Sequence, residues 1–275
     1  MDETITFTLD LEDHRPDESL PVRYPEMTEK ILEFLDRWNI KATVFTVGSL
    51  AKKDPETVRK VHAAGHEIAH HSYDHITLNR QSPAEFREDT RRAKEVIEDV
   101  IGEEVRGYRA PVFSLTRQTI WAVDILKELG FTYSSSVLPA ANPLHGIPGA
   151  PHTPFRWSNG LLEIPAPVGK IGPFLMPYLG GFYFRYLPYP IVRRQIKKAD
   201  DGAAPWTYWH PYDFDADEKN WRIKNASMPV SMLLWLNRKS TFKKLGRLAE
   251  NFKFDAPLRD RNFGSDLKII DPATL

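Results

Sequence analysis

Residues 42–75, ATVFTVGSLAKKDPETVRKVHAAGHEIAHHSYDH, predict a strand, a helix and a second strand in direct succession. The first strand is the apolar, β-branched run at 42–47. A helix should follow, because Asp54 is a good N-cap residue, Pro55 fits the first helical position and Gly65 is a typical helix end. The short apolar run after Gly65 leads into a group of histidines. This order of elements indicates a parallel sheet with helices outside it.

Strands and helices alternate along most of the remaining chain. Further strands are expected at 5–9, 107–109, 131–135, 161–164 and 205–209, and further helices at 31–38, after the capping box of Ser82 and Glu85, and at 116–129. Between about 139 and 190 the pattern weakens into a segment rich in proline, glycine and aromatic residues, which we expect to be an irregular insertion. The sequence therefore predicts an α/β fold in one domain, 1–275, with a core at about 4–215 and a C-terminal extension at 216–275.

Composition limits the kinds of partner. The chain has 275 residues, which suits one domain of α/β-barrel size. Lys plus Arg and Asp plus Glu both number 37, so no overall charge attracts nucleic acid, and the basic stretch at 238–247 resembles a solvated helix face. Cysteine is absent, which leaves metal binding to His, Asp and Glu. The N-terminus has neither a basic start nor an apolar run, and no stretch is long enough to span a membrane, so we expect a cytoplasmic protein.

Three histidines, His70, His71 and His75, lie within six positions. Imidazoles at positions i and i+4 can face one ion from a single turn or a tight loop. Such a pair plus one carboxylate leaves open positions for water and substrate, which favours a catalytic metal over a structural one.

An acidic cluster, Asp10, Glu12 and Asp13, stands at the end of the first predicted strand. Acids this close repel one another unless a cation compensates them, so a divalent metal is one explanation and a solvated acidic turn is the other. Because parallel strands bring their carboxyl ends to one edge, we expect this cluster to lie near the histidines.

Two later residues are candidates for the same edge. Arg109 could pair with a catalytic carboxylate, and Pro111 could stiffen the turn so that the N–H of Val112 points into the site, although an ordinary surface arginine is the alternative. His210 follows an aromatic strand and suits a general acid, or else it is a half-buried histidine packed on Trp209.

In this order, the acidic strand end, GHEIAHHSYDH at 65–75, Arg-x-Pro at 109–111 and the aromatic-strand histidine resemble the polysaccharide deacetylase family, the NodB-homology carbohydrate esterases. The resemblance covers about 6–214, and the region 180–215 is similar to the branch found with bacterial exopolysaccharide export systems. It implies a distorted (β/α)7 barrel, one divalent metal, usually zinc, held by an Asp and two His, and hydrolysis of an N-acetyl group on a hexosamine. His71 and His75 match the family's histidine ligands.

The acidic cluster departs from the family pattern, in which two adjacent Asp are base and ligand. We favour Asp10 as base and Asp13 as ligand; Glu12 as base beside Asp13, and Asp10 as base with Glu12 as ligand, remain alternatives. His70 stands where relatives often have Asn, so we expect it beside the ligands and not among them. A later family motif, whose Asp tunes the catalytic histidine, meets Tyr-Ser-Ser-Ser at 133–136 here and is not recognisable.

The resemblance implies that Arg109 holds the base, that the Val112 N–H and the metal stabilise an oxyanion, and that His210 protonates the leaving amine. Tyr183, Trp206 and Trp209 are candidate sugar-stacking residues. Alternative functions are hydrolysis of a cyclic ureide or formamide, and a catalytically silent carbohydrate-binding protein. The aromatic segment at 173–189 could contact a membrane, but a barrel-covering insertion is the interpretation that we favour.

Overall fold

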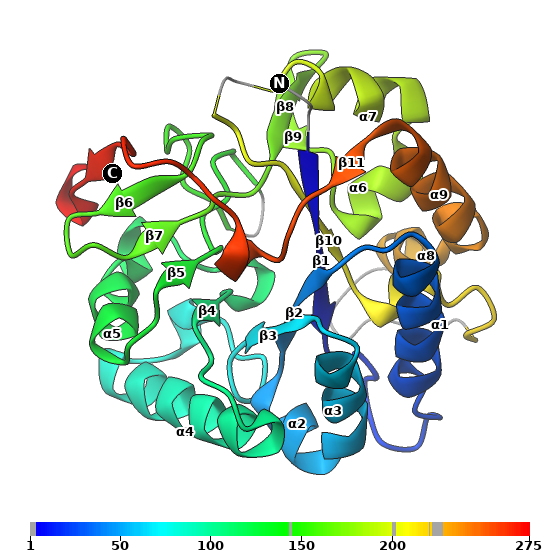
Figure 1. Cartoon of the computed structure of the whole chain (residues 1–275), viewed down its shortest axis with the longest axis horizontal. Helices are drawn as coiled ribbons and strands as arrows, with labels where there is room; N and C mark the ends of the chain where they lie inside the picture. Colours follow the sequence, from blue (N-terminus) through cyan, green and yellow to red (C-terminus); the bar gives the residue numbers. More distant parts are fainter. Residues whose placement is uncertain (1–3, 143–144, 200–201, 220, 222–227) are drawn as a thin grey trace.

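The computed structural model describes residues 4–142, 145–199, 202–219, 221 and 228–275. Within these residues, seven parallel strands form the centre of the protein (Figure 1). In order across the sheet they are β10 (Trp206–Trp209), β1 (Thr4–Leu11), β2 (Ala42–Thr46), β3 (Glu67–His70), β4 (Gly107–Tyr108), β5 (Tyr133–Ser134) and β7 (Leu162–Glu163). Strand β6 (Phe155–Trp157) then pairs antiparallel with β7. This arrangement confirms the predicted α/β barrel.

Helices pack around the outside of the strands (Figure 1). They are α1 (Tyr24–Arg37), α2 (Gly48–Lys53), α3 (Pro55–Ala63), α4 (Pro83–Ile101) and α5 (Ala122–Glu128). The predicted caps are present: the Asp54 side chain accepts a hydrogen bond from the Thr57 N–H, and Ser82 and Glu85 form a capping box.

The prediction of one helix over 116–129 is wrong in its first half. A 3₁₀ turn, Arg117–Thr119, comes first, and α5 begins only at Ala122. The hydroxyl of Thr119 accepts a hydrogen bond from the Thr116 N–H and donates one to the Ser114 carbonyl. These local bonds satisfy backbone groups in a tight turn and delay the start of the α-helix.

The expectation of an irregular insertion at 139–190 is only partly correct. Besides β6 and β7, this segment contains a hairpin of β8 (Val168–Ile171) and β9 (Phe174–Pro177), then α6 (Gly181–Tyr186) and α7 (Tyr189–Ile196). Gly172 allows the tight hairpin turn because its φ is +61°. The elements are short and are separated by Pro and Gly, so no periodic pattern builds up in the sequence.

The C-terminal part returns to the barrel. It contains α8 (Met228–Trp235), α9 (Thr241–Asn251), β11 (Lys253–Phe254), which pairs with β1, and β12 (Ile269–Ile270), which pairs with β6. The division between a core and an extension at 216 stays a prediction. Among the described residues, none of the helices combines the length and the apolar character needed to cross a membrane.

Candidate active site

The carboxyl ends of the strands bring three potential metal ligands together. Glu12 follows β1, His71 follows β3, and His75 lies in the loop beyond it. One carboxylate oxygen and one ring nitrogen from each histidine all lie within 4.8 Å of one another. The closest pair is His75 Nε2 and Glu12 Oε2, at 2.9 Å. His71 is buried, whereas the side chains of Glu12 and His75 are partly exposed, so solvent can reach the group.

The His71 ring is oriented by the backbone. Its Nδ1 lies 2.9 Å from the carbonyl oxygen of Arg109. Because a carbonyl oxygen only accepts hydrogen bonds, Nδ1 carries the proton, and the lone pair of Nε2 is available to a metal ion. The same Nε2 is 4.0 Å from Oδ2 of Asp10. Burial, the largest influence, lowers the pKa of His71 to about 4, which keeps the ring neutral as a metal ligand must be.

His70 supports the loop and does not join the group. Its Nδ1 accepts a hydrogen bond from the Ser72 N–H at 3.1 Å, and its Nε2 donates to the Thr90 carbonyl, also at 3.1 Å. Burial lowers the pKa of His70 to about 3, and only a neutral ring can make both bonds. Ser72 and His75 have φ values of 62° and 55°, so the loop that carries the ligands is tightly turned.

Arg109 is a buried cation inside the barrel and not a surface residue. Its guanidinium lies 3.8 Å from the ring centre of Phe45 and 4.2 Å from that of Trp206. Its Nη1 donates to Asp10 Oδ1 at 2.6 Å and to Thr8 Oγ1 at 2.9 Å. The pair fixes one oxygen of Asp10, and the other, Oδ2, faces the His71 ring.

The segment 133–136, which lacks the Asp of the family pattern, holds this arginine. Arg109 Nη2 donates to Ser135 Oγ at 3.2 Å, and the Ala110 N–H donates to Ser136 Oγ at 2.9 Å. Glu163, fully buried at the end of β7, accepts hydrogen bonds from the N–H groups of Ser136 and Val137 at 2.7 and 2.8 Å. The Trp157 indole N–H also donates to Glu163, at 3.3 Å. No signal in the sequence indicated this role of Glu163, because the N–H groups that it holds belong to a distant segment.

Asp13 does not join the metal-ligand group, so the favoured ligand assignment is not supported. Its carboxylate pairs with Arg15, at 2.6 Å between Oδ2 and Nη2 and 2.8 Å between Oδ1 and Nε. Asp10 and Glu12 are two positions apart and share the inner side of the chain, whereas Asp13 turns outward. The structure brings together the third alternative, with Glu12 beside His71 and His75.

His210 ends β10 and faces the same space. Its Nε2 is 3.9 Å from Asp10 Oδ2 and 3.7 Å from Glu12 Oε1. Its Nδ1 is 3.1 Å from Oδ2 of Asp213, a residue that sequence reasoning did not consider. Burial opposes protonation, but the hydrogen bond with Asp213 and the nearby carboxylates together raise the pKa of His210 to about 9. The ring stacks on Tyr212 at 4.6 Å between centres.

The turn at 111–113, which follows β4, has a strained backbone. Val112 and Phe113 have φ values of 54° and 52°, a region that β-branched and bulky residues rarely adopt. The Val112 side chain is 42% exposed, so packing does not explain the strain. Its role as an oxyanion donor stays a prediction.

Trp206 and Trp209 are wrongly predicted as sugar-stacking residues, because both are fully buried. Trp206 covers the Arg109 guanidinium, and Trp209 packs against Phe184 at 5.1 Å between ring centres. Strands of a parallel barrel pack against other side chains on both faces, so neither tryptophan of β10 reaches solvent. Tyr183 is half-buried, and its hydroxyl accepts a hydrogen bond from Asn142.

A cleft of about 590 Å³ opens above Glu12 and His75. Its aromatic lining comes from Tyr24, Tyr212 and Trp221. The sequence offered a signal for Tyr212, which lies two positions after His210 at the same strand end, but none for Trp221.

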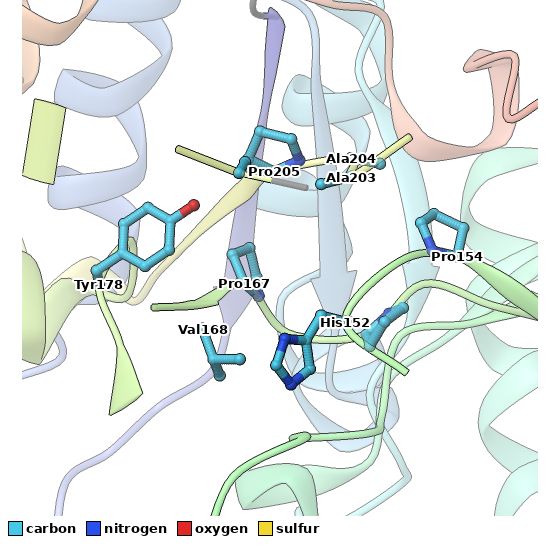
Figure 2. Close-up of a pocket in the computed structure, with 10 residues that line it drawn as sticks. His152, Pro154, Pro167, Val168, Tyr178, Ala203, Ala204 and Pro205 are labelled. Atoms are coloured by element: carbon cyan, nitrogen blue, oxygen red, sulfur yellow. The ribbon is translucent and has the colours of Figure 1, made fainter. Parts of the chain in front are cut away.

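Figure 2 shows a separate cavity between β8 and the start of β10. Its lining is mainly proline and alanine, with His152 and Tyr178 at its edge. The cavity measures about 30 Å³, roughly the share of liquid volume of a single water molecule, so it is too small for a sugar.

Comparison with known proteins gives two adjoining matches. A family profile described as polysaccharide deacetylase matches 3–134, and one described as a domain of unknown function, DUF3473, matches 135–259. The chain is 33% identical over 100 residues to a peptidoglycan-N-acetylglucosamine deacetylase of Bacillus cereus, covering 36% of each protein. It is 32% identical over 103 residues to a chitooligosaccharide deacetylase of a Bradyrhizobium species, covering 37% of this chain and 44% of that protein. The chain therefore spans less than half the length of these two relatives.

A crystal structure of a presumed polysaccharide deacetylase from Mycobacterium smegmatis resembles most of the chain, with a TM-score of 0.56, 20% identity and 90% of each chain covered. At this identity the likeness shows the fold alone. Both matched ranges contribute strands to one sheet, β1 to β5 from the first and β6, β7 and β10 from the second. Residues 3–134 thus match the polysaccharide deacetylase family, and the barrel that they begin shares its fold with the Mycobacterium smegmatis protein.

Proposed function

We propose that this protein is a metal-dependent hydrolase that removes N-acetyl groups from an N-acetylhexosamine polysaccharide or glycan precursor. The observation that carries the proposal is the convergence of Glu12, His71 and His75 within 4.8 Å. A carboxylate held by arginine and a histidine held by a carboxylate face the same space. These are the parts that metal-assisted hydrolysis of an amide uses: a metal site, a base and an acid.

The donor set fits a divalent ion such as zinc. Two imidazoles and one carboxylate are common zinc ligands, and three protein ligands leave a position for water or substrate. The Nδ1–H of His71 donates a hydrogen bond to the backbone carbonyl of Arg109, as the second ring nitrogen of metal-binding histidines usually does. A bound ion would act as a Lewis acid and lower the pKa of a coordinated water.

The chain's own residues would move the protons. Asp10 has one oxygen fixed by Arg109, and its Oδ2 is free to accept a proton from the attacking water. His210, whose pKa is raised to about 9, is protonated at neutral pH and would donate from Nε2 to the leaving amine. The Val112 N–H would donate a hydrogen bond to the developing oxyanion.

The cleft supports a sugar substrate. Its volume of about 590 Å³ accommodates more than one ring, and Tyr212 and Trp221 offer aromatic faces. The two curated relatives are named for N-acetylglucosamine in peptidoglycan and for chitooligosaccharides, which supports an N-acetylhexosamine. The resemblance of the region 180–215 to the exopolysaccharide branch makes an exopolysaccharide our first choice of polymer.

Membrane contact through the segment 173–189 stays a secondary interpretation. Phe174 is 67% exposed and Phe182 is 38% exposed, but Tyr178 is buried. The segment also packs on the barrel through Phe184, which is fully buried. A barrel cover remains the interpretation that we favour, and flotation with liposomes would test it.

Acetate release is the test of the proposed function. The chelator-treated protein would be assayed on N-acetylhexosamine oligomers with and without Zn²⁺, beside His71→Ala and the matched control His62→Ala, a surface histidine paired with Glu103. We expect acetate only with metal, none from His71→Ala and normal release from the control. Absence of acetate despite a bound metal would point to a ureide or formamide substrate, and absence of metal binding would point to a silent carbohydrate-binding protein.

A further inference from the structure

Asp213 contacts both the backbone and the imidazole ring of His210. The carboxylate is fully buried, and its Oδ2 accepts a hydrogen bond from the His210 backbone N–H at 2.9 Å and lies 3.1 Å from Nδ1. An ionised carboxylate only accepts hydrogen bonds, so Nδ1 must carry a proton. Nε2 is thereby the atom aimed at Asp10 and Glu12.

Arg185, from α6, forms a buried ion pair with Asp213, while its Nε–H donates a hydrogen bond to the Gly181 carbonyl. Its side chain is fully buried, and its Nε lies 3.1 Å from Asp213 Oδ1. Its Nη1 donates to the carbonyls of Leu234 and Leu236 at 3.1 and 2.5 Å. The arginine therefore ties the insertion, the C-terminal helix α8 and the turn after β10 to one carboxylate.

The glycine pair that precedes this arginine makes the approach possible. A Cβ on Gly181 would lie 2.0 Å from Asp213 Oδ2, and one on Gly180 would lie 2.0 Å from the ring of Tyr208. Any side chain at Gly181 would displace the carboxylate. The first turn of α6 is thus shaped around Asp213, which a covering insertion without a role in the site would not require.

We propose that Asp213 and Arg185 are positioning residues for the general acid: Arg185 fixes Asp213, and Asp213 fixes the His210 ring with Nε2 directed at the scissile nitrogen. The inference rests on the proposed function, because it assigns the insertion a part in the same reaction. It accounts for the Gly-Gly pair and the buried arginine together.

The test compares turnover of an amide substrate with turnover of an ester substrate in the same variants. An amine leaves only when it is protonated, whereas 4-nitrophenolate leaves from 4-nitrophenyl acetate without an acid. We expect Asp213→Asn to lower kcat on N-acetylhexosamine oligomers by about 100-fold, the usual contribution of a general acid, and to change ester turnover less than threefold. Arg185→Met should lower amide turnover about tenfold, with partial recovery in Arg185→Lys.

Backbone and folding controls are available. Gly181→Ala should reproduce the selective amide defect, whereas Gly246→Ala, where a Cβ meets nothing within 4 Å, should not. If Asp213→Asn fails to fold because Arg185 is left unpaired, the double variant with Arg185→Met removes both charges. Equal losses on both substrates, or no loss on the amide, would overturn the proposal.

A measurement without turnover completes the test. Nitrogen-15 NMR of metal-free protein above pH 9, where the His210 ring is neutral, should show that ring protonated on Nδ1 in the wild type. The His210 signals are identified by their absence in His210→Gln. The Asp213→Asn and Arg185→Met double variant should lose that preference. A wild-type ring protonated on Nε2 would refute the positioning role. Correct protonation in a wild-type protein that hydrolyses neither substrate would leave the positioning role standing and refute the proposed function.

Discussion

Replacing Glu12 by Gln should abolish tight metal binding, whereas replacing Asp13 by Asn should leave it nearly unchanged. Glu12 presents its carboxylate to both histidines of the group, at 2.9 Å from His75 Nε2. Asp13 is a matched control because it is one residue away, carries the same charge and is occupied by Arg15.

The size of the effect follows from these contacts. Loss of a group that only supports a ligand costs about 10- to 100-fold in metal affinity, so loss of a direct ligand should cost at least about 100-fold, or about 2.7 kcal/mol. The Asp13 side chain is 26% exposed and its charge is balanced by Arg15. Its removal should change affinity by less than about threefold, as is typical for a screened surface charge.

Competition with a chromophoric chelator would measure the Zn²⁺ dissociation constant of both variants, with far-UV circular dichroism as a check on folding. A large loss of affinity in Asp13→Asn together with a small one in Glu12→Gln would refute the assignment of Glu12. It would restore Asp13 as the carboxylate ligand despite its contact with Arg15.

Four further outcomes are expected. Arg109→Met should lower the free energy of unfolding by about 3–5 kcal/mol in urea titrations, because it leaves the buried charge of Asp10 unpaired; unchanged stability would contradict this. Val112→Gly should raise stability by up to about 1 kcal/mol, because relief of its positive φ outweighs the entropic cost of glycine, and a loss of more than about 1 kcal/mol would show that the turn is not strained. The buried His66 has its pKa lowered to about 4 by burial, below the unfolded value of 6.5, so the folded protein should lose up to about 3 kcal/mol as pH falls between these values. His66→Asn should lose less over the same range in paired urea titrations. Trp221→Ala should raise KM for oligomers by up to about tenfold without changing kcat, and an equal fall in kcat would argue against a stacking role.

The strand ends could be predicted from the sequence because local patterns fix the residues there. The histidine group follows a helix with clear start and end signals, and parallel pairing then carries it to the edge where Glu12 lies. The choice between Glu12 and Asp13 depends on strand alternation. Asp10 and Glu12 are two positions apart and so share a side, whereas the family pattern of two adjacent Asp favours Asp13.

The support of His210 could not be predicted in the same way. Arg185 and Asp213 are 28 positions apart and meet only because the first turn of α6 packs on the end of β10. No periodicity records such a contact. A partial signal existed, since Asp213 comes three positions after His210 and its carboxylate caps the turn that begins there. The burial of Trp206 and Trp209 depends likewise on what covers each face of β10, which residue type alone does not tell.

The anchoring of the site by protein groups has a consequence for metal exchange. The Arg109 side chain donates a hydrogen bond to Asp10, and the Arg109 backbone carbonyl accepts one from His71. The Asp213 carboxylate accepts one from His210. Protein groups alone make these contacts, unlike those of a zinc finger, in which the ion organises the chain. Under the proposed function, an ion could then enter and leave this site without unfolding of the barrel, so one cation could replace another. The metal held there would be decided by supply in the surroundings as much as by affinity.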